Sequence, residues 1–119
     1  MDFEISFRPE PLKGRSNYIE WINRSKIYFE INGFMSYIDG KKAPPNKALY
    51  TNSKGEFPTP ELAIKYDDDL SEYRLNERKA LGAVRSIISF DIAGRFMDKT
   101  TAKDLWDSIN KLYGESFTK

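Results

Sequence analysis

Residues 12–33 read LKGRSNYIEWINRSKIYFEING, and their pattern predicts the first helix of the chain. Asn17 suits the N-cap position, and Glu20 follows three residues later, which is the spacing of a capping box. Because one-sided aromatic stripes are usually buried, we expect Trp21 to lie in a hydrophobic core rather than to bind a ligand. Gly33 is expected to end the helix. The apolar stripe of this helix comprises Tyr18, Trp21, Ile22, Tyr28 and Phe29, and Ile27 and Ile31 widen it.

Before this helix, apolar residues alternate with polar ones, which predicts an extended segment or edge strand over residues 1–11. We expect Phe3, Ile5 or Phe7 to dock on the domain or on a neighbour. The segment has no basic start followed by an apolar run, so it is no signal peptide.

After the helix, residues 34–38 predict a short second helix that Asp39-Gly40 closes with a turn. Residues 41–60 then contain four prolines and predict a long, mobile loop. Leu49, Tyr50 and Phe57 are available to pin this loop to the core. Its lysines can touch RNA, but we favour the interpretation that they keep the loop solvated.

Thr59 and Pro60 predict the start of a long helix that runs to about Ser89, with a possible break between residues 66 and 69. The acidic run over residues 67–69 invites a metal-binding interpretation. Consecutive helical residues point in different directions, however, so we favour a solvated first turn of a restarting helix. Gly82 is expected to permit the close approach of another helix.

The carboxy-terminal part predicts a short helix over residues 91–97 and a last helix capped by Thr100 or Thr101. If Thr101 is the cap, Asp104 is in the reciprocal position. Gly114 fits the stop of this helix. Its buried stripe is expected to comprise Leu105, Ile109, Leu112 and Tyr113, with Trp106 at the flank.

Composition limits the function classes. The 119 residues suffice for one compact domain, and 19 basic against 18 acidic side chains give no overall drive toward nucleic acid or a membrane. The chain has no cysteine and no histidine, which removes the usual zinc ligands, the usual neutral-pH general base and the usual thiol nucleophile. We therefore expect no enzyme, no metal and no cofactor, and no membrane-spanning segment.

Two signatures carry a family resemblance. The first is residues 12–21, LKGRSNYIEW, and the second is residues 100–106, TTAKDLW, which continues to Leu112-Tyr113-Gly114. In this order, about one small domain apart, they resemble the Gag polyprotein of copia-type LTR retrotransposons, in the amino-terminal part of its capsid region. Between them Tyr73, Glu77, Ala80 and Val84 resemble the family's pattern, with tyrosine in place of the more usual tryptophan. The signature residues are Leu12, Gly14, Asn17, Tyr18, Trp21, Tyr73, Ala80, Val84, Leu105, Trp106 and Tyr113.

The resemblance implies an all-α domain of about five helices with a long Pro-rich loop, similar to the amino-terminal domain of a retroviral capsid. Residues 12–114 would form this domain, with an extended segment over 1–11 and a tail or linker over 115–119 toward a second domain. The implied function is structural: copies self-assemble in the cytoplasm into virus-like particles that enclose the element's RNA, which is bound through regions outside this chain. The alternative is a domesticated Gag-like host protein that acts as an interaction module or as an inhibitor of assembly.

Direct nucleic-acid binding by this domain is a third hypothesis, and an enzyme is the last. The exposed faces on which assembly contacts are expected lie on the first helix and on the long helix, because complementary charges can set the register between copies. More often such residues simply form a polar helix face. The candidate assembly residues are Glu20, Arg24, Lys26, Arg74, Arg78 and Arg85.

Overall fold

The computed structural model describes residues 8–114, and its regular elements are all helical within that range. This confirms the all-α class. The expected docking of Phe3, Ile5 and Phe7 lies outside the described residues. The helices are α2 (Tyr18–Ile31), α3 (Met35–Ile38), α4 (Pro60–Arg85), α5 (Phe90–Arg95) and α6 (Ala102–Gly114), joined by the 3₁₀ turns η1 (Arg15–Asn17) and η2 (Lys47–Leu49).

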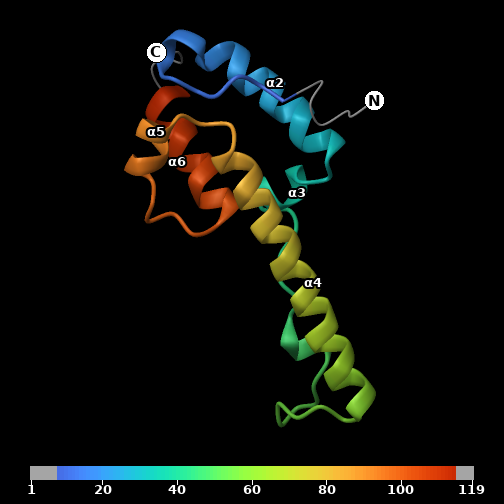
Figure 1. The fold of residues 1–119 in the computed structure, drawn as a ribbon. Coiled ribbons are helices and arrows are strands. Elements are labelled where there is room, and N and C mark those ends of the chain that lie inside the picture. The colour runs from blue at the N-terminus through green and yellow to red at the C-terminus, as the bar shows by residue number, and fades with distance from the viewer. Residues whose placement is uncertain (1–7, 115–119) are drawn as a thin grey trace.

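The helices gather around the second half of α4, while its first half projects away from them (Figure 1). α6 and α3 pack against α4, and the buried residues of α4 are Ala80, Leu81, Ala83 and Val84. The radius of gyration is 17.6 Å, against about 13.5 Å for a compact chain of this length. The projecting part therefore makes the molecule elongated; we call residues 41–72 the arm.

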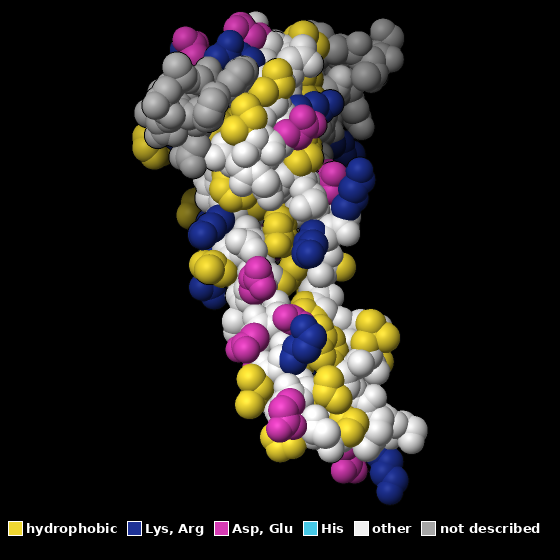
Figure 2. All heavy atoms as spheres, turned by 90° about the vertical axis from the view of Figure 1, so that its right-hand side faces the viewer, with side chains coloured by type: hydrophobic (Ala, Val, Ile, Leu, Met, Phe, Trp, Pro, Cys, Tyr) yellow, Lys and Arg dark blue, Asp and Glu magenta, His cyan; other side chains and the backbone are white. Residues whose placement is uncertain are grey.

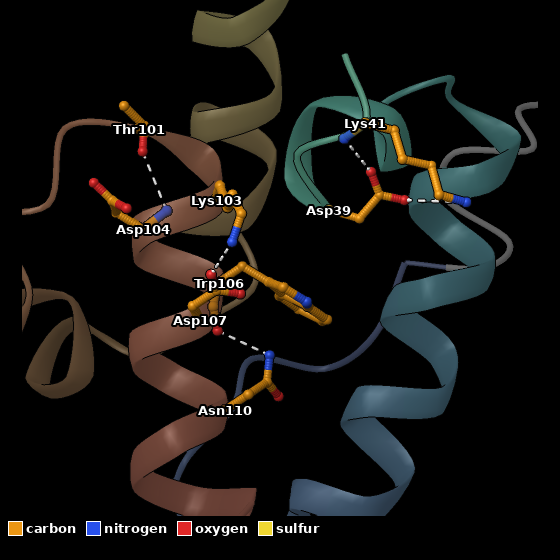
Figure 3. Close-up of polar contacts among 8 residues, drawn as sticks. All are labelled: Asp39, Lys41, Thr101, Lys103, Asp104, Trp106, Asp107 and Asn110. Carbon is orange, nitrogen blue, oxygen red and sulfur yellow. Dashed lines mark hydrogen bonds and ion pairs between the residues drawn. The ribbon is translucent and has the colours of Figure 1, made fainter. Parts of the chain in front are cut away.

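Side-chain caps fix the starts of three helices. Thr59 Oγ1 accepts a hydrogen bond from the backbone N of Leu62 at 3.3 Å, which confirms the expected start of α4. Thr101 Oγ1 accepts one from the N of Asp104 at 3.1 Å, so Thr101 is the one of the two expected residues that caps α6 (Figure 3). Ser89 caps the short helix α5.

The predicted capping box of α2 is wrong. Asn17 occupies the N-cap position, but its side chain makes no cap hydrogen bond. Its Oδ1 instead accepts from the N of Lys13, and its Nδ2 donates to the carbonyl of Pro11, both at 3.0 Å. Because the turn η1 leads directly into α2, the Asn17 side chain points back and fastens the preceding segment.

The long helix has no break near residues 66–69. α4 is continuous, because an acidic run does not interrupt the backbone ladder and Asp69 pairs with Lys65 one turn earlier at 3.1 Å. α4 ends at Arg85, before the expected Ser89. The next residues leave the helix to meet Leu12, whose N donates to Ile87 O at 2.9 Å and whose O accepts from the N of Ser89 at 3.0 Å.

Two further expectations are corrected. In α6, Trp106 is buried and Leu112 is 44% exposed, because the helical period places Trp106 with Ala102, Ile109 and Tyr113 at the centre of the apolar stripe. Gly82 is exposed, and a Cβ built there would meet no atom within 4 Å, so no helix within residues 8–114 approaches it closely.

The long loop packs on the first half of α4 rather than on the main core. The ring of Tyr66 lies 5.2 Å from that of Tyr50 and 5.8 Å from that of Phe57, centroid to centroid. Leu49, the third residue expected to pin the loop, is 81% exposed. Asp39-Gly40 forms the predicted turn, and Gly40 adopts a φ of 84° that favours glycine.

Candidate assembly surface

The two signatures meet in one hydrophobic core. The indole of Trp21 lies 5.3 Å from that of Trp106, centroid to centroid, and Phe29 makes an edge-on contact with Trp106 at 5.2 Å. Leu12, Leu105 and the other buried signature residues belong to the same cluster. The prediction that Trp21 is a core residue is confirmed, since it is 1% exposed. The members of the cluster that also belong to the signatures are Leu12, Tyr18, Trp21, Ala80, Val84, Leu105, Trp106 and Tyr113.

Polar side chains at this junction are paired within the core. Trp21 Nε1 donates to the carbonyl of Ile87 at 2.7 Å, so α2 is tied to the segment that follows α4. The Tyr18 hydroxyl donates to Asn110 Oδ1 at 2.6 Å and ties α2 to α6. Burial raises the pKa of Tyr18, which keeps its phenol protonated as the donor. These contacts fix the relative positions of three elements.

The remaining signature residues lie at the edge of the core. Tyr73 is half-buried, and its ring lies 5.6 Å from that of Tyr37, which joins α4 to α3. Gly14, at the start of η1, adopts a φ of 150°. Together with Asn17 it shapes the entry of the chain into α2. The signature residues thus have structural roles.

Sequence reasoning missed the role of Glu77. Its Oε1 accepts a hydrogen bond from the backbone N of Ala102 at 2.6 Å, so a carboxylate of α4 satisfies a free donor at the first turn of α6. The resemblance marked an acidic residue at this position, but only the fold brings the first turn of α6 against it. On the exposed side of α6, Lys103 pairs with Asp107. At the half-buried edge of the same helix, Asn110 Nδ2 donates to Trp106 O at 2.8 Å (Figure 3).

The candidate assembly residues of α2 are exposed. Glu20 and Arg24 line a polar cavity of about 290 Å³ with Arg8, Glu10 and residues of the α2 entry. Lys26 is exposed and does not line that cavity. The structure therefore brings Glu20 and Arg24 together and leaves Lys26 apart.

The candidate residues of α4 form one ridge. Arg74, Arg78 and Arg85 are all exposed, and their spacing of four and seven residues places them within about 40° of each other around the helix axis. Arg85 Nη2 also donates to the carbonyl of Lys99 at 3.1 Å, so this side chain stabilises the turn after α5.

A second cavity, of about 370 Å³, lies where Arg85 meets α5. Its lining is mainly apolar and includes Ile88, Phe96 and Leu105 together with two strongly exposed residues, Phe90 at 96% and Met97 at 77%. Sequence analysis placed residues 91–97 in a helix but did not single out its surface.

The arm carries its own small cluster. Lys47 Nζ lies 5.5 Å from the centroid of the Phe57 ring and 5.9 Å from that of Tyr66. The Tyr50 hydroxyl donates to Asp69 Oδ2 at 2.7 Å. A hydrogen bond from Tyr50, and to a smaller extent one from Lys65, lowers the pKa of Asp69, which keeps its carboxylate charged.

The acidic run does not form a metal site in the described part of the chain. Residues 8–114 contain no group of three or more His, Cys, Asp or Glu side chains arranged to hold an ion. Asp69 is instead used within the arm, as described above.

None of the helices in this range has the length and apolarity needed to cross a membrane. Comparison with protein-family models, curated proteins and solved structures finds no match.

Proposed function

We propose that this chain is a non-catalytic structural protein of the copia-type Gag class, whose copies assemble into a particle around the element's RNA. The observation that carries the proposal is the contact between Trp21 and Trp106, at 5.3 Å between ring centroids. The two signatures behind the resemblance are far apart in sequence, yet they pack into one core. The family interpretation requires this, because it places both signatures in a single domain.

The chemistry of the chain supports a structural role over a catalytic one. Without cysteine and histidine, carboxylates, lysines and tyrosines are the groups left for acid and base chemistry. In the described residues, the clearest such constellation is Tyr50, Lys65 and Asp69, and its members are hydrogen-bonded to each other across the arm. These hydrogen bonds stabilise the arm.

The proposed partners are further copies of the chain, with RNA bound through regions outside it. Basic and acidic side chains are nearly balanced over the chain, so its net charge gives no overall attraction to RNA. Weak contacts repeated many times suffice for a shell, because multivalency multiplies small affinities. Particles of this kind are proposed to form in the cytoplasm.

Charge reversal on the α4 ridge tests this proposal. Arg78→Glu is the cleaner change, since Arg78 is exposed whereas Arg85 holds Lys99 through a hydrogen bond. Negative-stain microscopy of concentrated protein is expected to show rings or particles for the wild type and fewer for Arg78→Glu. The matched control is Lys111→Glu, on an exposed position of α6, with unchanged assembly. Equal assembly by all three proteins would show that the α4 ridge makes no assembly contact.

A further inference from the structure

One face of α4 carries an exposed stripe of residues at alternating spacings of three and four. This spacing repeats every seven residues and places its members on one side of a helix, as in a coiled coil. The opposite side is covered by the same chain, since Tyr66 packs on Tyr50 and Tyr73 on Tyr37. We call the exposed residues the α4 stripe: Glu61, Ile64, Asp68, Ser71, Leu75, Arg78, Gly82 and Arg85.

The α4 stripe exposes aliphatic side chains where the same chain gives them no cover. Ile64 is 60% exposed and Leu75 is 52% exposed. Gly82 has open space above its Cα, with no atom within 4 Å of a Cβ built there. Figure 2 shows hydrophobic and acidic side chains interspersed along the arm. A second helix can approach this face closely at Gly82 and cover the two aliphatic residues.

The charges of α4 change sign halfway along the helix. Residues 60–72 contain five carboxylates and one lysine, whereas residues 73–85 contain four basic side chains and one carboxylate. The helix dipole favours acidic residues only in the first turn, so it accounts for Glu61 but not for Asp68 or Glu72. Neither Glu61 nor Asp68 takes part in an ion pair within residues 8–114.

Such a helix is complementary to an antiparallel copy of itself. When two copies of α4 lie antiparallel with the midpoint between Ser71 and Leu75 aligned, each of the eight stripe residues of one copy faces a stripe residue of the other. Four different pairs result. Two join opposite charges, one places an aliphatic side chain over glycine, and one joins leucine to serine. These pairs are Glu61 with Arg85, Asp68 with Arg78, Ile64 with Gly82, and Leu75 with Ser71.

We propose that a second copy of this chain covers the α4 stripe, in an antiparallel pair related by a two-fold axis. The inference rests on the proposed self-assembly and names one contact within it. α4 cannot pair with itself within one copy, because it is one continuous helix of about 39 Å and its two halves cannot fold onto each other. The pair is isologous, so each contact occurs twice.

The pair is expected to be weak. Each copy contributes only Ile64 and Leu75 as large aliphatic residues, and the rest of the α4 stripe is polar or small. Surface ion pairs add little each, and they act mainly on register and orientation. Weak pairing suits a contact that other contacts in a shell reinforce.

Cysteine cross-linking tests the antiparallel register. The chain has no cysteine, so introduced thiols are the only ones present. A mixture of Ile64→Cys and Gly82→Cys proteins is expected to form a disulfide-linked dimer on mild oxidation. Ile64→Cys alone should not, because the two copies of residue 64 lie about 27 Å apart along the axis in this arrangement. A mixture of Asp67→Cys and Gly82→Cys proteins is the matched control. Residue 67 lies off the α4 stripe, so this mixture should not form the linked dimer.

Charge reversal tests the pairing energetically. Asp68→Arg and Arg78→Asp are each expected to raise the dimer dissociation constant about tenfold, because each creates two like-charge pairs. The double variant restores both pairs and should recover the affinity. Sedimentation velocity gives the dissociation constants, and circular dichroism checks that each variant is folded. A dimer linked by Ile64→Cys alone, or a double variant no tighter than the single ones, would overturn the inference.

The outcomes separate this contact from the proposed function. Particles that form equally well from wild type and Asp68→Arg, without the Ile64–Gly82 cross-link, would overturn the α4 pair and leave the shell proposal in place. A specific cross-link and charge rescue from a chain that never forms anything beyond a dimer would support the α4 pair and contradict the shell.

Discussion

The carboxylate of Glu77 accepts a hydrogen bond from the backbone N of Ala102 at 2.6 Å, and so joins the middle of α4 to the start of α6. Ala102 is fully buried, so its N–H has little access to water. A charged acceptor at a helix start satisfies a free donor and interacts favourably with the dipole. α6 is therefore held by Glu77 as well as by its own cap, Thr101.

Removing this acceptor is expected to destabilise the domain. Glu77→Ala leaves the N–H of Ala102 without its partner and should lower the free energy of unfolding by about 1–2 kcal/mol. Glu77→Gln keeps an acceptor oxygen and should lose less. Urea denaturation measures both values. Equal stability of wild type and Glu77→Ala would show that the hydrogen bond contributes nothing in solution.

Gly82→Ala is expected to stabilise the monomer. Gly82 lies inside α4, has no positive φ, and has open space where the new Cβ would lie. Replacing a helical glycine by alanine typically gains about 0.5–1 kcal/mol. Thermal unfolding at low concentration measures the effect on the monomer. Gly40→Ala provides the opposite control, because Gly40 has a φ of 84° and its Cβ would lie 2.8 Å from Lys103.

The packing of the arm is expected to depend on acid pH through Asp69. Hydrogen bonds from Tyr50 and Lys65 lower its pKa below the ordinary value of 3.8. A lowered pKa in the folded state gives stability that is present above pH 3.8 and is lost as the pH falls through the lowered value.

NMR spectra of the Tyr50 ring should therefore report loosening of the arm at strongly acid pH. Asp69→Asn removes the charged acceptor, so the same ring should show the loosened state already at neutral pH and little further acid change. Asp67→Asn, two residues earlier and exposed, is the control, and its Tyr50 ring should show the same change at acid pH as in the wild type. Wild-type behaviour of Asp69→Asn would contradict the assignment.

Trp21 and Trp106 allow the core hydrogen bond to be measured separately from the loss of ring volume. Trp21→Phe removes the Nε1 donor and leaves Ile87 O without this partner, whereas Trp106→Phe removes a similar volume from the same cluster. Both should destabilise the domain, and Trp21→Phe is expected to cost about 1 kcal/mol more. Denaturation curves of the two variants give the difference. A larger loss for Trp106→Phe would mean that packing outweighs the hydrogen bond.

Local sequence signals predicted the helices well. Thr59-Pro60 and Thr101 mark the starts of α4 and α6, because capping depends on residues within one turn. The end of α4 at Arg85 and the hydrogen bonds of the Asn17 side chain were not predictable in this way. Both are set by the segment around Leu12, which approaches residues 87–89 from the other end of the sequence. The partner of Glu77 is likewise a residue that only the tertiary fold brings near.

The candidate surfaces were predicted less completely than the core. Arg74, Arg78 and Arg85 were expected on one face of α4 and are exposed there. The arm was missed, because the sequence left a break near residues 66–69 open and so did not establish that α4 is continuous. Periodicity shows which face of a helix is apolar, but it does not show that residues 60–72 project away from the core.

The most direct test of the account is the mass of the wild-type chain in solution as a function of concentration. Light scattering up to about 1 mM, with negative-stain microscopy of the same samples, covers the affinity range of weak, repeated contacts. The account predicts a mass that rises with concentration and ends in rings or closed particles. A mass that stays at that of the monomer over the whole range, with empty grids, would contradict the central claim that this chain builds a shell.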